Sequence, residues 1–139
     1  MRFHSRWILL GCVTLGMACA TAALGQSKVE RGKYLVEQVA QCGACHTPAG
    51  DDGAPDRTRW LKGAVLPFAP IQPVKNWHKT APDLTPASRL WQKWGEAGLV
   101  KFMTTGVGPS GNPADPPMPG YKLTQDDAEA VVAYLKSLP

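Results

Sequence analysis

Hydrophobic residues recur at helical spacing in two segments, one in the first third of the chain and one at its end. In the first segment the apolar positions are Val29, Leu35, Val36 and Val39. Ser27 and Glu30 form a capping box, in which the two side chains satisfy backbone N–H groups at a helix start. The pattern therefore predicts a helix over 28–41. Gly32 lies within it, where a glycine either admits a close neighbour or is incidental.

The last segment repeats this pattern. Its apolar positions are three and four residues apart, at Ala128, Val131, Val132, Leu135 and Leu138. Thr124 is a favourable N-cap, and Asp126 and Asp127 complement the positive end of the helix dipole. We expect a helix that starts after Thr124 and runs to about Leu138.

The middle of the chain predicts shorter helices and long loops. A short helix begins after Thr85, which serves as its N-cap, and is interrupted at Gly95 and Gly98. A helix from about Glu96 to Thr105 then ends at Gly106. Residues 50–81 and 107–120 are rich in turn-forming residues and show no alternation of apolar and polar positions. We therefore expect an all-α fold without a substantial sheet.

The first 25 residues have the composition of a secretory signal peptide. Arg2 and Arg6 provide a positive start, residues 7–23 carry no charge, and small residues then cluster as signal peptidase requires. The apolar stretch is short for a membrane-spanning helix, which needs about 20 residues. We expect cleavage of 1–25, export to the periplasm and a single domain over 26–139. Membrane contact would require that the first segment be retained.

Export changes both the cysteine count and the charge. Cys12 and Cys19 leave with the signal peptide, so that Cys42 and Cys45 remain. The formal charge of +4 includes two arginines of the signal segment, and the rest of the chain carries +2. No run of lysine and arginine indicates nucleic-acid binding. The basic residues of the 75–101 segment are either a solvated face or a docking patch for an acidic redox partner.

The remaining cysteines belong to the motif Cys-x-x-Cys-His, formed by Cys42, Cys45 and His46, which is the attachment pattern of a c-type haem. Each thiol can add to one haem vinyl group, and the adjacent imidazole then binds the iron. A Cys-x-x-Cys pair also occurs in redox disulfides and zinc sites. A zinc site needs two more Cys or His ligands, and only His78 is available. A redox disulfide belongs in a βαβ context, which the pattern lacks. One covalent haem c is the expected cofactor.

A haem that transfers electrons usually has a second axial ligand, and His78, Met103 and Met118 are the candidates. Met118 lies in the sequence Asp-Pro-Pro-Met-Pro-Gly, where flanking prolines stiffen the loop that presents its thioether. Met103 shares a helical stripe with Phe102 and is expected in the core. His78 is expected at the surface or facing a haem propionate. We therefore expect His46 and Met118 as the two iron ligands.

These features together resemble class I monohaem cytochromes c. The haem motif follows one helix, the methionine comes about seventy residues later between prolines, and an amphipathic helix follows. The segments APDLTP and WGEAGLVKFMTTGV make the chain similar to small periplasmic cytochromes that serve bacterial dehydrogenases. The resemblance implies a cytochrome c-like fold in which the first and last helices cross, with Gly32 and Tyr34 facing Tyr134 and Leu135.

The chain departs from the family at one point. Members often carry a Gly-Pro pair after the haem motif, whose carbonyl orients the proximal histidine. Here Gly53-Ala54-Pro55 does not match that pair, and the stretch that continues to Phe68 is enlarged. His46 still needs an acceptor for its second ring nitrogen, and the sequence alone names no residue for it.

The resemblance implies one-electron transfer and no catalysis by the chain itself. A histidine and a methionine saturate the iron and raise its potential relative to two histidines. Implied donors are a periplasmic dehydrogenase or a quinol-oxidising complex, and implied acceptors are an oxidase or another cytochrome. The chain would be a monomer or a subunit of such a complex. The alternative is a haem-based ligand sensor or a peroxidase-like protein, which needs a displaceable sixth ligand.

Overall fold

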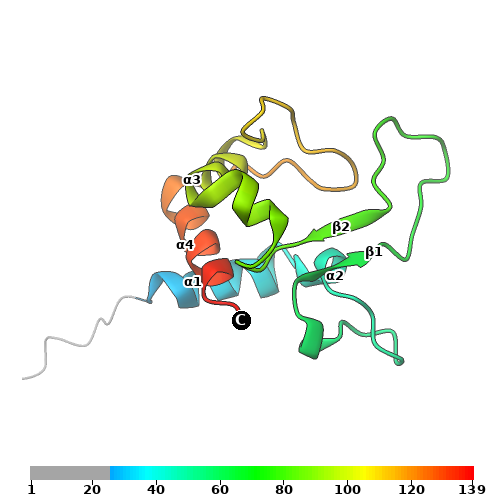
Figure 1. Ribbon diagram of the computed structural model, residues 1–139, viewed down its shortest axis with the longest axis horizontal. Coiled ribbons are helices and arrows are strands. Elements are labelled where there is room, and N and C mark those ends of the chain that lie inside the picture. Colours follow the sequence, from blue (N-terminus) through cyan, green and yellow to red (C-terminus); the bar gives the residue numbers. More distant parts are fainter. Residues whose placement is uncertain (1–25) are drawn as a thin grey trace, which may run out of the picture.

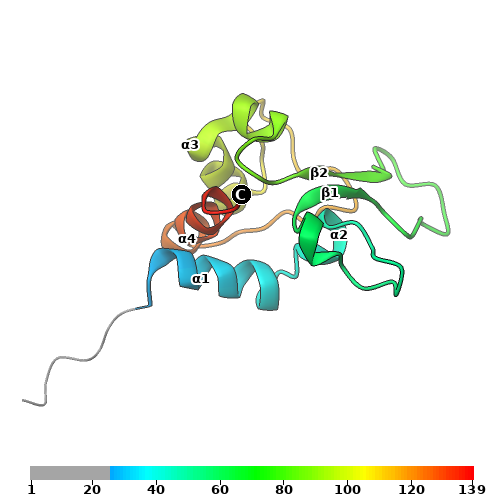
Figure 2. The same ribbon diagram turned by 60° about the horizontal axis from the view of Figure 1, so that its bottom comes forward.

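The computed structural model describes residues 26–139, and the predicted signal peptide lies outside the described residues. The elements are α1 (Lys28–Tyr34), the π-helix η1 (Leu35–Val39), α2 (Gly43–His46), the 3-10 helix η2 (Arg57–Arg59), β1 (Lys62–Val65), β2 (Thr80–Asp83), α3 (Arg89–Thr105) and α4 (Gln125–Lys136). In Figures 1 and 2, α1, α3 and α4 pack together, and the β1–β2 hairpin extends away from them with α2 beside it.

The first predicted helix is confirmed, although its last turn is wider than an α-helix. Ser27 accepts a hydrogen bond from the Glu30 N–H at 3.2 Å, and its own N–H donates to the Glu30 carboxylate at 3.0 Å. In η1 the Ala40 N–H donates to the carbonyl of Leu35, five residues back, at 2.8 Å. Gln41 then adopts a left-handed conformation with φ 50° and turns the chain into the cysteine motif.

The first and last helices cross at close range, as the resemblance implied. A Cβ atom at Gly32 would lie 1.9 Å from the Ala130 carbonyl oxygen and 2.8 Å from Cβ of Tyr134. Only a glycine fits there, so the close-neighbour interpretation is confirmed. Tyr34 is 48% exposed beneath the Arg31 guanidinium. Gly32 therefore determines how closely α1 and α4 approach.

The all-α expectation is not exact, because β1 and β2 form a two-stranded antiparallel sheet in which Lys62 pairs with Asp83. Leu61 and Leu66, which flank β1, are 0% and 8% exposed, and Leu61 belongs to the hydrophobic core. The backbone between them then satisfies its hydrogen bonds with the neighbouring segment. The strands contain Gly, Ala, Pro and charged residues in place of alternating β-branched ones, so the pattern carries no strand signal.

Helix α3 begins later than predicted. Ser88 is its N-cap and accepts the Trp91 N–H at 3.4 Å. Thr85, the predicted cap, closes a turn ahead of the helix, because its carbonyl accepts the Ser88 N–H at 3.0 Å. The predicted interruption at Gly95 is confirmed by its φ of 62° and ψ of 179°, whereas Gly98, the other predicted interruption, lies within the helix. The helix ends at Gly106 with φ 72°.

The hydrophobic core lies between the helices and the start of β1. Its buried members are Leu35, Val36, Leu61, Met103, Ala128, Val131, Tyr134 and Leu135. Met103 is 8% exposed, which confirms its predicted place in the core. Helix α4 starts as predicted, because the Thr124 side chain accepts the Asp127 N–H at 3.2 Å. Over residues 26–139, no helix has the length and apolar character needed to cross a bilayer.

Candidate functional site

Cys42, Cys45 and His46 lie on one helical turn formed by α2 and its N-cap. The N–H groups of Cys45 and His46 donate to the Cys42 carbonyl at 3.2 and 2.9 Å. Both thiols are free and half-buried. Burial raises the pKa of the Cys42 thiol to about 11, so this thiol stays protonated at neutral pH. Two free thiols beside a histidine are the groups that covalent haem attachment requires.

The His46 imidazole is 5% exposed and held by the hairpin. Its Nδ1 lies 2.8 Å from the Pro82 carbonyl oxygen. A carbonyl only accepts, so Nδ1 carries the proton and Nε2 keeps its lone pair for a metal. Burial lowers the pKa of the imidazole, while the hydrogen bond to Pro82 opposes this shift. The ring is therefore neutral near pH 7, which is the form that binds iron.

The hairpin that the sequence did not predict is what brings Pro82 to this histidine. Pro82 belongs to β2. The pairing of β2 with β1 extends past the strands, because the Leu84 N–H donates to the Leu61 carbonyl at 2.9 Å. Thr47, the residue after His46, accepts the Leu61 N–H on its side chain at 2.9 Å. The turn that carries the histidine and the hairpin that carries the carbonyl are thus joined through Leu61.

The indole of Trp60 lies behind the cysteine turn. A Cβ atom at Gly43 would lie 2.2 Å from Cη2 and 2.3 Å from Cζ3 of this indole, so the first residue between the cysteines has to be a glycine. The Trp60 Nε1–H donates to the Tyr134 hydroxyl at 3.1 Å. The Arg57 guanidinium lies 4.0 Å from the centroid of the indole on one face. Trp60 therefore fixes α2 against α4.

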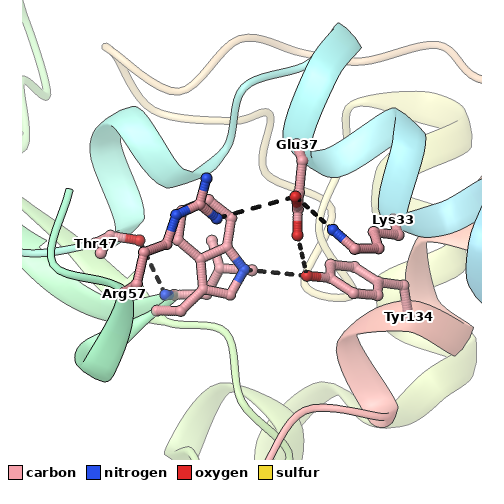
Figure 3. Close-up of polar contacts among 7 residues, drawn as sticks. Lys33, Glu37, Thr47, Arg57 and Tyr134 are labelled. Carbon is pink, nitrogen blue, oxygen red and sulfur yellow. Dashed lines mark hydrogen bonds and ion pairs between the residues drawn. The ribbon is translucent and has the colours of Figure 1, made fainter. Parts of the chain in front are cut away.

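A polar network continues from Tyr134 to the first helix (Figure 3). The Tyr134 hydroxyl donates to Glu37 at 2.6 Å, and the Lys33 ammonium donates to the same carboxylate at 2.6 Å. Burial opposes ionisation of Glu37, but the hydrogen bonds from Lys33 and Tyr134 hold its pKa below the usual range. Burial and the bond to Glu37 raise the pKa of Tyr134 to about 12. The network connects η1, α4 and the indole behind α2.

Met118 is half-buried in a loop that is tied to the segment before β2. The Met118 N–H donates to the Asp115 carbonyl at 3.0 Å. The His78 N–H donates to the Pro116 carbonyl at 2.8 Å, and the Asn76 amide donates to the Asp115 carboxylate at 3.2 Å. The His78 ring, 59% exposed, lies 3.3 Å from that carboxylate. His78 is thus at the surface, which was one of its two expected positions.

The far end of the Met118 loop lies beside the cysteine turn. Tyr121 donates its hydroxyl to the Ala40 carbonyl at 3.3 Å. Burial raises the pKa of Tyr121, and the phenol lies close to both Cys42 and Cys45. The loop that contains the methionine therefore ends against the segment that contains the cysteines. Sequence reasoning missed Tyr121, since nothing local links it to residues some eighty positions earlier.

Trp77 supplies a test of whether the surroundings fit a haem. Its Nε1–H is the buried side-chain donor among residues 26–139 that has no partner within the chain. Leaving such a group unsatisfied costs about 1–3 kcal/mol, so its environment calls for an acceptor from outside the chain. A haem propionate is an acceptor of this kind. Phe68 packs edge-on against Trp77, with ring centroids 5.9 Å apart.

The other chemistries considered for the motif find no support in the described residues. Over 26–139, no three side chains of His, Cys, Asp or Glu converge as a metal-ion site would require. A zinc site at Cys42 and Cys45 therefore lacks its further ligands. The free thiols, the neutral imidazole with a fixed Nδ1–H and the unsatisfied Trp77 donor instead fit a covalent haem.

Comparisons with known proteins agree with this chemistry. Residues 29–139 match the family model described as Cytochrome c. A diheme cytochrome c-type protein of Cereibacter sphaeroides is 34% identical over 115 residues, covering 79% of this chain and 35% of that protein. The fructose dehydrogenase cytochrome subunit of Gluconobacter japonicus is 31% identical over 115 residues, 78% of this chain and 22% of the subunit.

The quinone-dependent alcohol dehydrogenase of Gluconobacter oxydans has a cytochrome c subunit that is also similar. It is 32% identical over 125 residues, which cover 84% of this chain and 25% of the subunit. The chain thus spans between about a fifth and a third of the length of these relatives.

Proposed function

The chain belongs to the cytochrome c family, and we propose that it carries single electrons in the periplasm from a dehydrogenase or a quinol-oxidising complex to an oxidase or another cytochrome. The family binds haem c covalently, and haem c is the cofactor of this chain. The sequence contains a single Cys-x-x-Cys-His motif and so takes one haem. The protein is an electron carrier and does not itself catalyse a reaction.

In this proposal Cys42 and Cys45 hold the haem covalently, His46 binds the iron through Nε2, and Met118 binds it through its thioether. The observation that carries the proposal is the buried His46 ring, whose Nδ1 lies 2.8 Å from the Pro82 carbonyl. A neutral imidazole with a fixed tautomer and a fixed ring plane is what an iron ligand requires. When bound, the haem supplies a one-electron Fe(III)/Fe(II) couple.

The residues around the site hold the proposed iron ligands in place and keep proton transfer out of the electron-transfer step. Pro82 holds the proton on Nδ1 of His46, so the imidazole does not gain or lose one near pH 7. The Trp77 Nε1–H offers a hydrogen bond to a propionate. The bonds from Asn76 and His78 to the Asp115–Pro116 segment limit the motion of the loop that presents Met118. Ligands held in this way support electron exchange with little rearrangement.

The choice of partner is supported by the relatives. Two of them are named as cytochrome subunits of a fructose dehydrogenase and of a quinone-dependent alcohol dehydrogenase. A dehydrogenase is therefore the favoured electron donor. Periplasmic location follows from the signal peptide predicted at 1–25.

A potentiometric titration of the haem-loaded protein, followed by absorption spectra, tests the function and the ligands together. We expect a reversible one-electron couple and the absorption band of a thioether–iron bond near neutral pH. Met118→Ala should lose this band, lower the potential and let the reduced protein bind carbon monoxide. Met103→Leu, a volume-conserving change in the core, is the matched control and should keep the band. A wild-type protein without the band that binds carbon monoxide readily would instead be a ligand sensor or a peroxidase-like protein.

A further inference from the structure

The connection between β1 and β2 displays large apolar side chains to solvent. Val65, Phe68, Ile71 and Val74 are 75%, 47%, 97% and 42% exposed. We call these four residues the apolar loop. They recur at every third position, and a proline stands between each of them and the next. In Figures 1 and 2 the connection projects beyond the hairpin, away from the helices, so its outer side is open to a partner.

The apolar loop is held in place by contacts at its base. Leu66 is 8% exposed, and its N–H donates to the Lys79 carbonyl at 2.9 Å, which closes the neck of the loop. The Trp77 N–H donates to the Val74 carbonyl at 3.3 Å, and Phe68 packs on the Trp77 ring. The intervening prolines fix φ and reduce the conformational entropy that binding would otherwise remove. Exposed apolar side chains on such a preformed surface mark an interaction site.

The segment that carries the apolar loop has formal charges of one sign, although Asp115 lies against its base. Residues 60–82 contain Lys62, Lys75 and Lys79 and no aspartate or glutamate. All three lysines are exposed, and within the described part of the chain none of them forms an ion pair. A surface of this kind is complementary to an apolar depression that is bordered by carboxylates.

The apolar loop is also tied to the loop of the proposed iron ligand. Asn76 and His78, which follow Val74, make the hydrogen bonds to Asp115 and Pro116 described above. A partner seated on the apolar loop would therefore lie next to the Met118 loop. Electron exchange requires such proximity, whereas attachment to a lipid surface does not. Residues 65–74 also contain no Trp or Tyr, which are the residues that concentrate at membrane interfaces.

We propose that the apolar loop is the docking surface for a redox protein whose matching surface is an apolar depression bordered by aspartates and glutamates. The proposal rests on the electron-transfer function proposed above and adds to it the place where the partner binds. Four apolar side chains with three lysines suit the small interfaces of transient redox complexes, which bury less than about 1,200 Å². The lysines steer the encounter, and the apolar contact holds the complex.

The test uses the haem-loaded protein with Ile71→Asp and Val74→Asp as loop variants. Val29→Asp is the matched control, because Val29 on α1 is 40% exposed against 42% for Val74. Electron exchange is measured by stopped flow with washed membranes of the native host, which contain its dehydrogenases and oxidases, and separately with a small inorganic reductant. We expect each loop variant to react about tenfold more slowly with the membranes, as for the loss of an interface anchor. Val29→Asp should react like the wild type.

The small reductant needs no docking surface, so its rate should be the same for all four proteins. Raised salt should slow the wild-type reaction with membranes, because lysines steer the encounter. Loop variants that react with membranes like Val29→Asp would overturn the proposal. A second result would also overturn it. If the wild type sedimented with phosphatidylglycerol vesicles and the loop variants did not, while electron exchange stayed the same, the apolar loop would bind lipid. A wild type that exchanges electrons with neither reagent would reject the electron-transfer function itself.

Discussion

Gly43 is the position in the haem motif where the structure makes its sharpest energetic demand. A methyl group added there would lie 2.2 Å from Cη2 of Trp60, far inside contact distance. The indole has little freedom to withdraw. Its Nε1–H is bonded to Tyr134 at 3.1 Å, and the Arg57 guanidinium covers its ring. Gly43→Ala therefore forces either α2 or the indole to move.

The cost follows from three terms. Overpacking a well-packed region costs about 1–3 kcal/mol. If the indole withdraws, the bond to Tyr134 is lost, which adds about 0.5–1.5 kcal/mol. Alanine is favoured over glycine within a helix by about 1 kcal/mol, and this offsets part of the cost. We therefore expect Gly43→Ala to lower the free energy of unfolding by about 1–3 kcal/mol, since the propensity gain and the lost bond nearly cancel. In a domain of this size the melting temperature falls by several degrees.

A double-mutant cycle on the haem-loaded protein isolates the clash. Unfolding by denaturant is followed by haem absorbance for Gly43→Ala, Trp60→Leu and the double variant. Trp60→Leu removes the ring atoms that the new methyl group meets, so adding Gly43→Ala to it should cost nothing or stabilise the protein. The coupling energy then equals the clash. Ala44→Gly, at the exposed neighbouring position, calibrates the helix-propensity term. A neutral Gly43→Ala, or the same cost with and without the indole, would refute the reasoning.

Further predictions concern the network, the helix crossing and the Met118 loop. The pKa of Glu37 is lowered in the folded protein, so the ionised carboxylate contributes its full stabilisation above pH 4.5, the ordinary pKa, and loses it as pH falls through the folded pKa. Glu37→Gln should therefore flatten the acid side of a plot of unfolding free energy against pH. Gly32→Ala should lower the free energy of unfolding by about 3 kcal/mol or more, measured by thermal melting, because the Ala130 carbonyl cannot withdraw without separating the helices. Asp115→Ala removes the hydrogen bond from Asn76 and frees the Met118 loop, so it should raise the carbon monoxide affinity of the reduced protein. An unchanged affinity would contradict the role of Asp115 in holding this loop.

Local signals predicted the parts of this fold that depend on residues close together in sequence. The capping box at Ser27 and the N-cap at Thr124 mark helix starts because each hydrogen bond spans three residues. The break at Gly95 follows from the conformational freedom of glycine. The predicted cap at Thr85 was wrong. Ser88 is an equally good cap by sequence, and only the position of Trp91 decides between the two.

The contacts that complete the site join residues far apart in sequence, and no local pattern contains them. Pro82 follows His46 by 36 positions, and Trp60 precedes Tyr134 by 74. Pro82 has no N–H to donate to a strand ladder, which made β2 look like a loop. Its carbonyl, fixed in direction by the hairpin, accepts from the imidazole.

The hairpin therefore explains both departures of this chain from the pattern it resembles. The acceptor of the His46 ring does not come from the Gly53-Ala54-Pro55 segment or from the enlarged stretch to Phe68, but from Pro82 on the second strand of the hairpin. Once β2 must pair with β1 to hold Pro82, the residues between the strands have to leave the core and return to it. Those residues carry Phe68, Ile71 and their neighbours to the surface. Orientation of the proposed iron ligand and exposure of the proposed docking surface are then two consequences of one hairpin, and a deletion that shortened the loop while keeping the β1–β2 pairs should separate them.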